Sequence, residues 1–521
     1  MRTFPDGFLF GVSTAGHQIE GNNTTSDTWF LEQQQPSVFT EPSGLACNSF
    51  ELWESDLDLV ASFGLNAYRF SVEWARVEPE EGRFDDAAID HYEAMVDGCV
   101  ARGLKPVVTL NHFTSPHWFA CRAGWLDPEA PELFARYVAK VIARFGERLA
   151  FVITFNEPDL PAMLQWANLP PVVAELERAT LDAASASAGV ERYRVANVVL
   201  PEDMDAIADG MTAGHRAAKA IVKDRYPELP VGFSLAMVDD VVVGDDPSVR
   251  DRKRAEVYGR WLELAREDDF LGVQNYERLT YDGNGLVLPE GAASGALYGG
   301  SEPRSLAECV KYANSVAGVP ILVTEHGMEG QDDAKRVAFI EDSLLHLLDV
   351  IDSGVAVLGY LHWTLLDNFE WIFGYEKTLG LVAVDRETFA RTPKPSAAAL
   401  AAIATGRGVP DPVTSEALVA TDRPGRYGKQ LASHLSKRVA SQWDDETGTG
   451  SLVFGHGGRA DLAAVDGGLR FELVARPASV ARLEDVIGRH LVRFGARDEL
   501  AVAWTRSDGT AGTTQRNSED D

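Results

Sequence analysis

Two glutamates directly follow apolar, β-branched runs: Glu157 in the sequence TFNEP and Glu325 in VTEHG. A carboxylate at the end of a buried strand is costly unless it is paired or used in chemistry. Two carboxyl groups that face each other can cleave a glycosidic bond, one by donating a proton and the other by attacking the sugar carbon. In retaining enzymes the two groups lie about 5–5.5 Å apart. We therefore expect Glu157 and Glu325 to form a catalytic pair.

Arg69, in the apolar run 66–72, is a cation that could keep Glu325 ionised. The negative charge of Glu325 would then raise the pKa of Glu157, so that Glu157 holds a proton. Once Glu325 becomes an ester its charge disappears, and Glu157 becomes a stronger acid. It could then act as a base toward water.

Eight short apolar runs alternate with amphipathic helical patterns along the first 400 residues. The runs are Phe8–Ser13, Asn66–Val72, Pro106–Asn111, Phe151–Phe155, Val231–Ala236, Phe270–Tyr276, Ile321–Thr324 and Val357–Trp363. Strands buried on both faces have this composition, and their alternation with helices indicates parallel βαβ units. The pattern predicts an α/β protein with a (β/α)8 TIM barrel. An open doubly wound sheet is the alternative, but no GxGxxG turn follows the first run and there is no Walker-type loop.

Barrel enzymes collect their functional groups where the strands end. Besides the two glutamates, eight residues at or after those ends are candidates for the site. They are Gln18, Arg69, His112, Asn156, Tyr276, Trp363, Glu370 and Trp371. Indole rings offer flat faces to sugar C–H groups, and amide, imidazole and carboxyl groups form directional hydrogen bonds with hydroxyls.

The composition changes at about residue 405. We expect a glycosidase-like barrel over 1–405, a linker over 406–416 that contains GVPDPVTSE, a small α+β domain over 417–507 and a disordered tail over 508–521. The predicted small domain combines two amphipathic helical patterns with short strand-like runs.

The chain has 521 residues and a net charge of −31, which argues against nucleic acid and anionic membrane surfaces as partners. The first residues lack the apolar stretch of a signal peptide, and no window is long and apolar enough to span a membrane. Four dispersed cysteines form no CxxC motif, so we expect no disulfide framework, metal site or cofactor. These features favour a cytoplasmic protein with a small-molecule substrate and leave a homo-oligomer open.

The sequence resembles glycoside hydrolase family 1, the β-glucosidase-like retaining enzymes, over residues 4–402. The motifs that carry the resemblance occur in family order: FPDGFLFGVSTAGHQIEG, AYRFSVEWARVEPEEGRFD, LNHFTSPHWF, TFNEP, DFLGVQNY, ILVTEHG and HWTLLDNFEWIFGY. The resemblance implies that Glu157 is the acid/base and Glu325 the nucleophile, with Arg69 and Tyr276 supporting Glu325. It also implies a sugar site lined by Gln18, His112, Asn156, Trp363, Glu370 and Trp371.

The chain departs from the family pattern at His326, Gln274, Phe113 and Leu379, and Leu379 replaces a frequent aromatic residue. Glu370 indicates a sugar without a phosphate, since a carboxylate accepts hydrogen bonds from hydroxyls but repels a 6-phosphate. The 6-phospho-glycosidases of the family lack this glutamate. The resemblance therefore implies a non-phosphorylated β-glucoside or β-galactoside as substrate.

The stretch Leu418–Arg506 resembles domain of unknown function 2218, through VATDRPGRYGKQLASHLSKRV, LEDVIGRHLVRFGARDELAVAW and an FGHG turn. That resemblance implies no chemistry. For the whole chain, two alternatives to hydrolysis stay open. One is a transglycosylating or non-hydrolytic tailoring enzyme of a specialised metabolite on the same barrel, and the other is a catalytically weak sugar-binding or regulatory protein.

Overall fold

The structure is a computed structural model that describes residues 2–167, 169–288, 300–437, 439–454 and 458–516. The chain divides into two compact units. One consists of Phe4–Gln331 and Leu345–Thr405, and the other of Met1–Thr3, Asp332–Leu344 and Gly406–Asp521.

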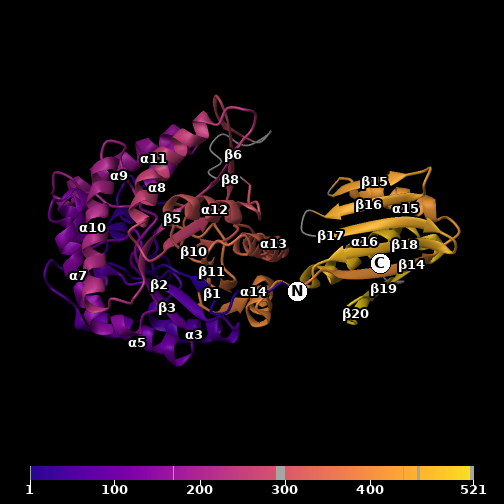
Figure 1. The fold of residues 1–521 in the computed structure, drawn as a ribbon, viewed down its shortest axis with the longest axis horizontal. Helices are drawn as coiled ribbons and strands as arrows, with labels where there is room; N and C mark the ends of the chain where they lie inside the picture. The colour runs from indigo at the N-terminus through magenta and orange to yellow at the C-terminus, as the bar shows by residue number, and fades with distance from the viewer. Residues whose placement is uncertain (1, 168, 289–299, 438, 455–457, 517–521) are drawn as a thin grey trace. The chain divides into compact units, whose positions relative to one another are not determined.

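Eight parallel strands close into a barrel in the first unit (Figure 1). In chain order they are β1 (Leu9–Ser13), β2 (Ala67–Ser71), β3 (Lys105–Asn111), β4 (Phe151–Asn156), β5 (Val231–Ala236), β7 (Leu271–Asn275), β10 (Ile321–His326) and β11 (Val357–Trp363). Strand β1 pairs with both β2 and β11, so the sheet has no free edge. The predicted (β/α)8 barrel is confirmed, and the open sheet is ruled out.

The barrel strands are buried along almost their whole length, which explains their continuous apolar sequences. A buried apolar cluster fills the barrel interior, and most of its members lie in the first three residues of a strand or just before it. The cluster consists of Leu9, Ala67, Val107, Ile153, Phe270, Leu322 and Leu361. Polar side chains are consequently left to the other end, where the strands finish.

Helices surround the barrel (Figure 1). The long ones are α3 (Ser49–Ser62), α5 (Asp86–Ala101), α7 (Ala130–Phe145), α9 (Pro171–Ala188), α10 (Met204–Arg225), α11 (Ser248–Ala265), α12 (Ser305–Ala317), α13 (Asp333–Asp352) and α14 (Pro395–Gly406). Helix α7 shows why they form: Pro131 lies in its first turn, and its buried residues repeat every three to four positions.

Short elements build the loops. They are α1 (Gly16–Ile19), α2 (Asp27–Glu32), α4 (Trp74–Val77), α6 (His117–Cys121), α8 (Leu160–Trp166), η1 (Gly124–Leu126), η2 (Gly146–Arg148), η3 (Trp371–Phe373), β6 (Asp239–Val242), β8 (Arg278–Asp282), β9 (Gly285–Val287), β12 (Val382–Val384) and β13 (Arg391–Pro393). Strands β6, β8 and β9 form one small sheet, and β12 and β13 form another.

The second unit contains a seven-stranded antiparallel sheet in the order β15-β16-β17-β18-β14-β19-β20. Its strands are β14 (Val413–Ala420), β15 (Ala440–Asp444), β16 (Thr449–Phe454), β17 (Gly458–Val465), β18 (Gly468–Ala475), β19 (Ala501–Arg506) and β20 (Ala511–Arg516). Helices α15 (Pro424–Leu435) and α16 (Pro477–Phe494) share one apolar core with the inward residues of the sheet, while η4 (Ala496–Asp498) follows α16. Both helices therefore pack on the same face.

Two expected segments differ from the structure. The linker expected over 406–416 is interrupted at Val413, where β14 begins, because Val413, Ser415, Ala417 and Val419 alternate inward and are buried. Strand β20 lies in the segment expected to be a disordered tail. It pairs with β19, and Gln515 accepts a hydrogen bond from the Trp504 indole at 3.1 Å, which secures this polar strand. Residues 517–521 of that tail lie outside the described residues.

Candidate active site

The expected site residues lie at the ends of the barrel strands. Glu325 is the second-to-last residue of β10 and pairs in register with Gln274 of β7. Glu157 directly follows the last residue of β4. Around the ring, β7 and β5 separate β10 from β4. The two glutamates therefore approach the barrel mouth from nearly opposite sides.

Glu325 is held through both of its carboxyl oxygens. Arg69 donates from Nη1 to Oε1 at 2.5 Å, and the Tyr276 hydroxyl donates to Oε2 at 2.5 Å. Nε2 of His112 lies 4.0 Å from Oε1. Only 3% of Glu325 is exposed, so these donors fix its orientation in a site that is shielded from solvent.

Arg69 is itself fixed by two further side-chain acceptors. Its Nη2 donates to Oδ1 of Asn156 at 2.6 Å, and its Nε donates to Oγ1 of Thr109 at 3.0 Å. The same Asn156 oxygen accepts a bond from Gln274 Nε2 at 2.8 Å. Arg69 is fully buried, and so the network delivers a fixed positive charge to Glu325.

Glu157 has a different environment. Its backbone lies in the left-handed region, with φ of +47°, which is uncommon for a residue with a Cβ atom and costs conformational energy. In the described part of the chain, no side chain donates a hydrogen bond to its carboxyl group. Burial and the negative charge of Glu325 raise the pKa of Glu157 well above its ordinary value.

The two carboxyl groups thus differ in their preference for a proton. Burial also raises the pKa of Glu325, but the charge of Arg69 and the hydrogen bond from Tyr276 oppose this rise. Among the described residues no side chain donates a hydrogen bond to the Glu157 carboxyl group, and the Arg69 charge lowers the pKa of Glu157 by less than the charge of Glu325 raises it. When one proton is shared between the two groups, it resides on Glu157, which leaves Glu325 ionised.

A second group of expected residues forms a polar and aromatic wall. Gln18 donates from Nε2 to Oε2 of Glu370 at 3.1 Å and to the Phe369 carbonyl at 2.9 Å. The His112 ring stacks near Trp363 and Trp371, with centroids 5.8 and 6.2 Å apart. The wall therefore combines flat apolar rings with hydrogen-bonding groups.

Charges near this wall follow from burial. Burial and the nearby Arg69 lower the pKa of His112 well below its ordinary value, so the imidazole is neutral. Burial and the charge of Glu325 raise the pKa of Glu370 to about 8. Among the described residues, Gln18 Oε1 and His112 Nδ1 are buried without a hydrogen-bond partner. Such atoms are free to bind a hydroxyl-rich ligand.

All ten expected residues are therefore found in one region. Direct contacts join Arg69, Asn156, Tyr276 and Glu325; Gln18 and Glu370 form a second group, and His112, Trp363 and Trp371 a third. Glu157 is linked to Glu325 and Glu370 through their charges.

Three residues of the surrounding network were not among the ten expected site residues, although Gln274 is one of the departures from the family pattern. Thr109 and Gln274 fix Arg69 and Asn156, and they point inward from the strand positions that precede the strand ends. His17 stacks on Trp371 with centroids 5.8 Å apart and an interplanar angle of 6°. Burial opposes protonation of His17, but Glu32, at 2.8 Å, outweighs it and raises the pKa of His17. The sequence position of His17, directly before the expected residue Gln18, was the signal that could have identified it as part of the site.

His326, one of the departures from the family pattern, directly follows Glu325 at the end of β10. Its Nδ1 lies 3.0 Å from the Tyr360 hydroxyl, which lies 2.9 Å from Nδ1 of His362. Burial lowers the pKa of His326 to about 3, so the ring is neutral. A neutral, hydrogen-bonded imidazole fits a positioning role.

Within the described ranges, no group of three or more His, Cys, Asp or Glu side chains has a geometry that could hold a metal ion. In the same ranges, no helix is both long and apolar enough to cross a membrane.

Comparisons with known proteins match the barrel part of the chain to glycoside hydrolases. Residues 1–199 and 301–409 match the model of glycosyl hydrolase family 1, and residues 416–505 match a family of uncharacterised proteins conserved in bacteria, domain of unknown function 2218. The chain is 32% identical to a β-glucosidase of Agrobacterium sp. over 77% of this chain and 95% of that protein. A protein described as probable inactive β-glucosidase 14, from Oryza sativa subsp. japonica, is 28% identical over 75% of this chain and 89% of that protein. Among solved structures, β-glycosidase BGL167 is 41% identical, with a TM-score of 0.72, and covers 78% of this chain and 98% of its own.

Proposed function

The chain belongs to glycosyl hydrolase family 1 and is a β-glycosidase, and from this premise we propose that it hydrolyses non-phosphorylated β-glycosides with retention of anomeric configuration. The observation that carries the proposal is the unequal environment of the two glutamates: Glu325 is bound by Arg69 and Tyr276, whereas Glu157 is buried and no side chain of the described residues donates a hydrogen bond to it. Glycoside hydrolysis requires one protonated and one ionised carboxyl group, and retention is the stereochemical outcome that membership of this family implies.

In the first step, the Glu325 carboxylate attacks the anomeric carbon while Glu157 donates its proton to the glycosidic oxygen. The bond from the anomeric carbon to that oxygen breaks, the alcohol leaves, and a glycosyl ester forms on Glu325. The ionised state of Glu325 makes it a nucleophile, and the raised pKa of Glu157 keeps a proton available near neutral pH.

In the second step, Glu157 acts as a base. Esterification removes the negative charge of Glu325, which is one cause of the raised pKa of Glu157. Glu157, which gave its proton to the leaving alcohol in the first step, therefore stays ionised and can accept a proton from water, whose oxygen attacks the anomeric carbon. The ester bond breaks, and Glu325 returns as a carboxylate that Arg69 and Tyr276 stabilise.

The sugar itself would bind against the polar and aromatic wall. Gln18, Asn156 and Glu370 supply hydrogen bonds to hydroxyls, neutral His112 offers Nδ1, and Trp363 and Trp371 cover the C–H faces. A β-glucoside or β-galactoside without a phosphate fits this set of neutral and acidic groups.

The direct test is turnover of nitrophenyl β-glucoside, β-galactoside and β-fucoside by the full chain, with Glu325→Ala as the control. Release of nitrophenol that disappears in Glu325→Ala, with the β-anomer produced first in early NMR spectra, supports the proposal. No release by a folded protein would instead favour a non-hydrolytic tailoring enzyme or a catalytically weak sugar-binding protein.

Hydrolysis and transfer are separated by adding an alcohol acceptor and analysing the products. A dominant alkyl glycoside at low acceptor concentration would favour the transglycosylating alternative. A cytoplasmic location and a homo-oligomer both stay predictions, to be tested by cell fractionation and by light scattering.

A further inference from the structure

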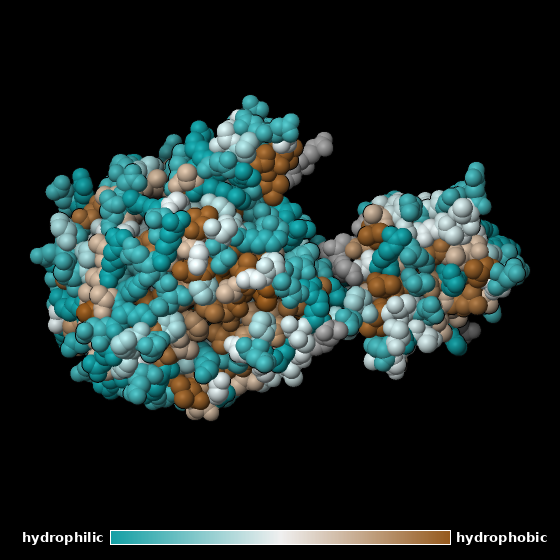
Figure 2. Space-filling model, viewed as in Figure 1, coloured by the Kyte–Doolittle hydropathy of each residue, from teal (hydrophilic) through white to brown (hydrophobic). Residues whose placement is uncertain are grey.

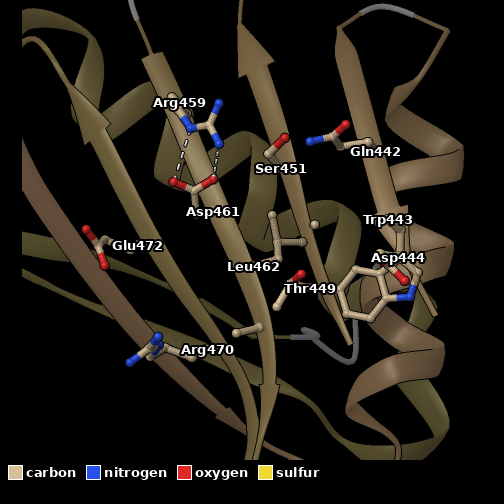
Figure 3. Close-up of a pocket in the computed structure, with 12 residues that line it drawn as sticks. Gln442, Trp443, Asp444, Thr449, Ser451, Arg459, Asp461, Leu462, Arg470 and Glu472 are labelled. Carbon is tan, nitrogen blue, oxygen red and sulfur yellow. Dashed lines mark hydrogen bonds and ion pairs between the residues drawn. The ribbon is translucent and has the colours of Figure 1, made fainter. Parts of the chain in front are cut away.

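The C-terminal unit carries a hollow of about 500 Å³ on its sheet (Figure 3). Side chains of four consecutive strands, β15 to β18, line it. Its volume falls in the range of about 300–1,000 Å³ in which small-molecule sites occur. Four strands at the usual spacing span roughly 14 Å, so the hollow is elongated across the sheet.

The hollow belongs to the face of the sheet opposite α15 and α16. Along β17, Ala460 and Leu462 are buried in the core shared with those helices, whereas Arg459 and Asp461 between them are exposed. Strand β18 repeats the pattern, with Arg470 and Glu472 exposed. The hollow forms because Ser451 and Ala463, on its outward face, are small, while the charged side chains around them are long.

The hydrogen-bonding groups of the hollow include both donors and acceptors. Arg459 donates from Nη2 to Oδ1 of Asp461 at 2.6 Å and from Nε to Oδ2 at 3.1 Å, and Figure 3 shows this pair beside Arg470 and Glu472. In the part of the chain that the structure describes, the side chains of Arg470 and Glu472 have no hydrogen-bond or ion-pair partner. One offers donors and the other acceptors, and the Gln442 amide on β15 offers both.

This mixture discriminates between classes of ligand. Two guanidinium groups oppose a cation, and the carboxylates of Asp444, Asp461 and Glu472 oppose an anion. The few apolar groups on the floor do not suit a purely apolar ligand. A neutral molecule with many hydroxyl groups satisfies both the donors and the acceptors without burying an unpaired charge.

Apolar side chains border the hollow as well. Val453 and Val474 flank Arg459 in register on the two neighbouring strands, and Leu418 lies opposite Arg470. Their exposed fractions are 41%, 38% and 59%. Hydrophobic and hydrophilic residues intermingle on the C-terminal unit in Figure 2. Sugar rings present C–H faces together with hydroxyls, and they match a surface that mixes both kinds of group.

We propose that this hollow, lined by Gln442, Ser451, Arg459, Asp461, Arg470 and Glu472, binds a short neutral oligosaccharide at a second site, independent of the barrel. The unit would then hold the protein on a saccharide while the barrel acts on its own substrate. Its binding does not depend on Glu157 or Glu325.

The test is a calorimetric titration of the full chain with cellotetraose, in the Glu325→Ala background so that no hydrolysis occurs. Glu472→Ala removes an acceptor from the hollow, and Ala463→Tyr fills its floor with a residue that suits a strand. The matched control is Glu416→Ala, because Glu416 is exposed, lies opposite Glu472 on β14 and is outside the hollow. Thermal melting confirms that each variant is folded.

We expect a binding event that weakens at least tenfold in Glu472→Ala and Ala463→Tyr but not in Glu416→Ala. Turnover of small nitrophenyl glycosides should be equal for these three variants in the background with Glu325 intact. A titration that is the same for all variants would overturn the proposal. So would a change in the mass measured by light scattering in Glu472→Ala, because the face would then be an interface between copies. Absence of nitrophenyl glycoside turnover would contradict only the proposed hydrolysis in the barrel. Oligosaccharide binding in the hollow is measured by the titration, so the two proposals can fail independently.

Discussion

Arg69 and Glu325 form a buried ion pair, with 2.5 Å between Nη1 of Arg69 and Oε1 of Glu325. Desolvating two charges is costly, and this pair is retained together with the further acceptors Asn156 and Thr109 around the guanidinium. Such a fixed charge makes Glu325 the ionised member of the two glutamates. Substituting either Arg69 or Glu325 would leave the charge of the other residue buried and unpaired. Removing the hydroxyl of Tyr276 changes the environment of Glu325 while keeping the ion pair.

Tyr276→Phe removes the hydrogen bond to Oε2 of Glu325 and keeps the ring. The pKa of Glu325 should rise, because the donor stabilises the carboxylate. The nucleophile must be ionised, so the acidic limb of kcat/KM against pH should move to higher pH, by about one unit, with a loss of roughly 10–150-fold in kcat/KM. An unchanged acidic limb would contradict the assigned role of Tyr276.

Glu157→Ala should lower kcat by about 10²–10⁴-fold for glycosides with poor leaving groups. A dinitrophenyl glycoside should be less affected in its first step, because dinitrophenolate leaves without a proton. Azide should restore turnover, since it can attack the glycosyl ester without a base, and the product should be the β-glycosyl azide. An α-azide, or an equal loss for all leaving groups, would be inconsistent with Glu157 as the acid/base.

Because the pKa of Glu370 is raised, we expect the preference against phosphorylated sugars to depend on pH. Its pKa of about 8 means that it is largely protonated at pH 7 and ionises as the pH rises through 8. The ratio of kcat/KM for nitrophenyl β-glucoside to that for its 6-phosphate should therefore increase above pH 8, as the carboxylate comes to repel the phosphate. In Glu370→Gln the ratio should stay flat. A ratio without pH dependence in the parent protein would show that Glu370 does not face that end of the sugar.

Because the pKa of Glu484 is lowered, we expect the stability of the C-terminal unit to depend on pH. Burial opposes its ionisation, but hydrogen bonds from Arg506, Ser415 and Thr513 outweigh burial and lower its pKa to about 2. The ordinary value for an unfolded chain is about 4.3, so this stabilisation is present above that pH and is lost as the pH falls toward 2. Glu484→Gln should destabilise the unit by about 3–5 kcal/mol at pH 7.

Thermal melting of the full chain measures this effect. Asp485→Asn is the matched control, because Asp485 neighbours Glu484 on α16 and pairs with the exposed Arg489, so it should cost less than about 1 kcal/mol. Equal melting of the two variants would mean that the Glu484 network does not stabilise the fold.

The barrel could be predicted from sequence because its strands are buried on both faces. The run Val357–Trp363 and strand β11 have identical bounds, since a continuous apolar run between helical patterns has few other interpretations. Two strands of the C-terminal sheet were harder. Strand β14 begins inside a stretch that has the composition of a linker, with Thr414 and Glu416 on its outward side, and β20 consists of AGTTQR, which has no apolar run. Their pairing partners, distant in sequence, stabilise them.

The site was predictable to the extent that its residues belong to recognisable motifs at strand ends. Thr109 and Gln274 act through other residues, and only the register of neighbouring strands reveals that they meet Arg69 and Asn156. The raised pKa of Glu370 was also beyond the sequence, because it arises from burial next to Glu325. A carboxylate had been expected there, and below pH 8 the group is instead largely neutral.

The double-displacement mechanism requires a glycosyl ester at Glu325, and this ester can be trapped. A dinitrophenyl 2-deoxy-2-fluoro-β-glucoside forms the ester quickly through its good leaving group, while the fluorine slows its hydrolysis. Mass spectrometry of peptides from the inactivated protein should find one fluoroglucosyl group on Glu325. A label on another residue, or continued turnover with no label and an α-anomer as first product, would contradict the double-displacement mechanism.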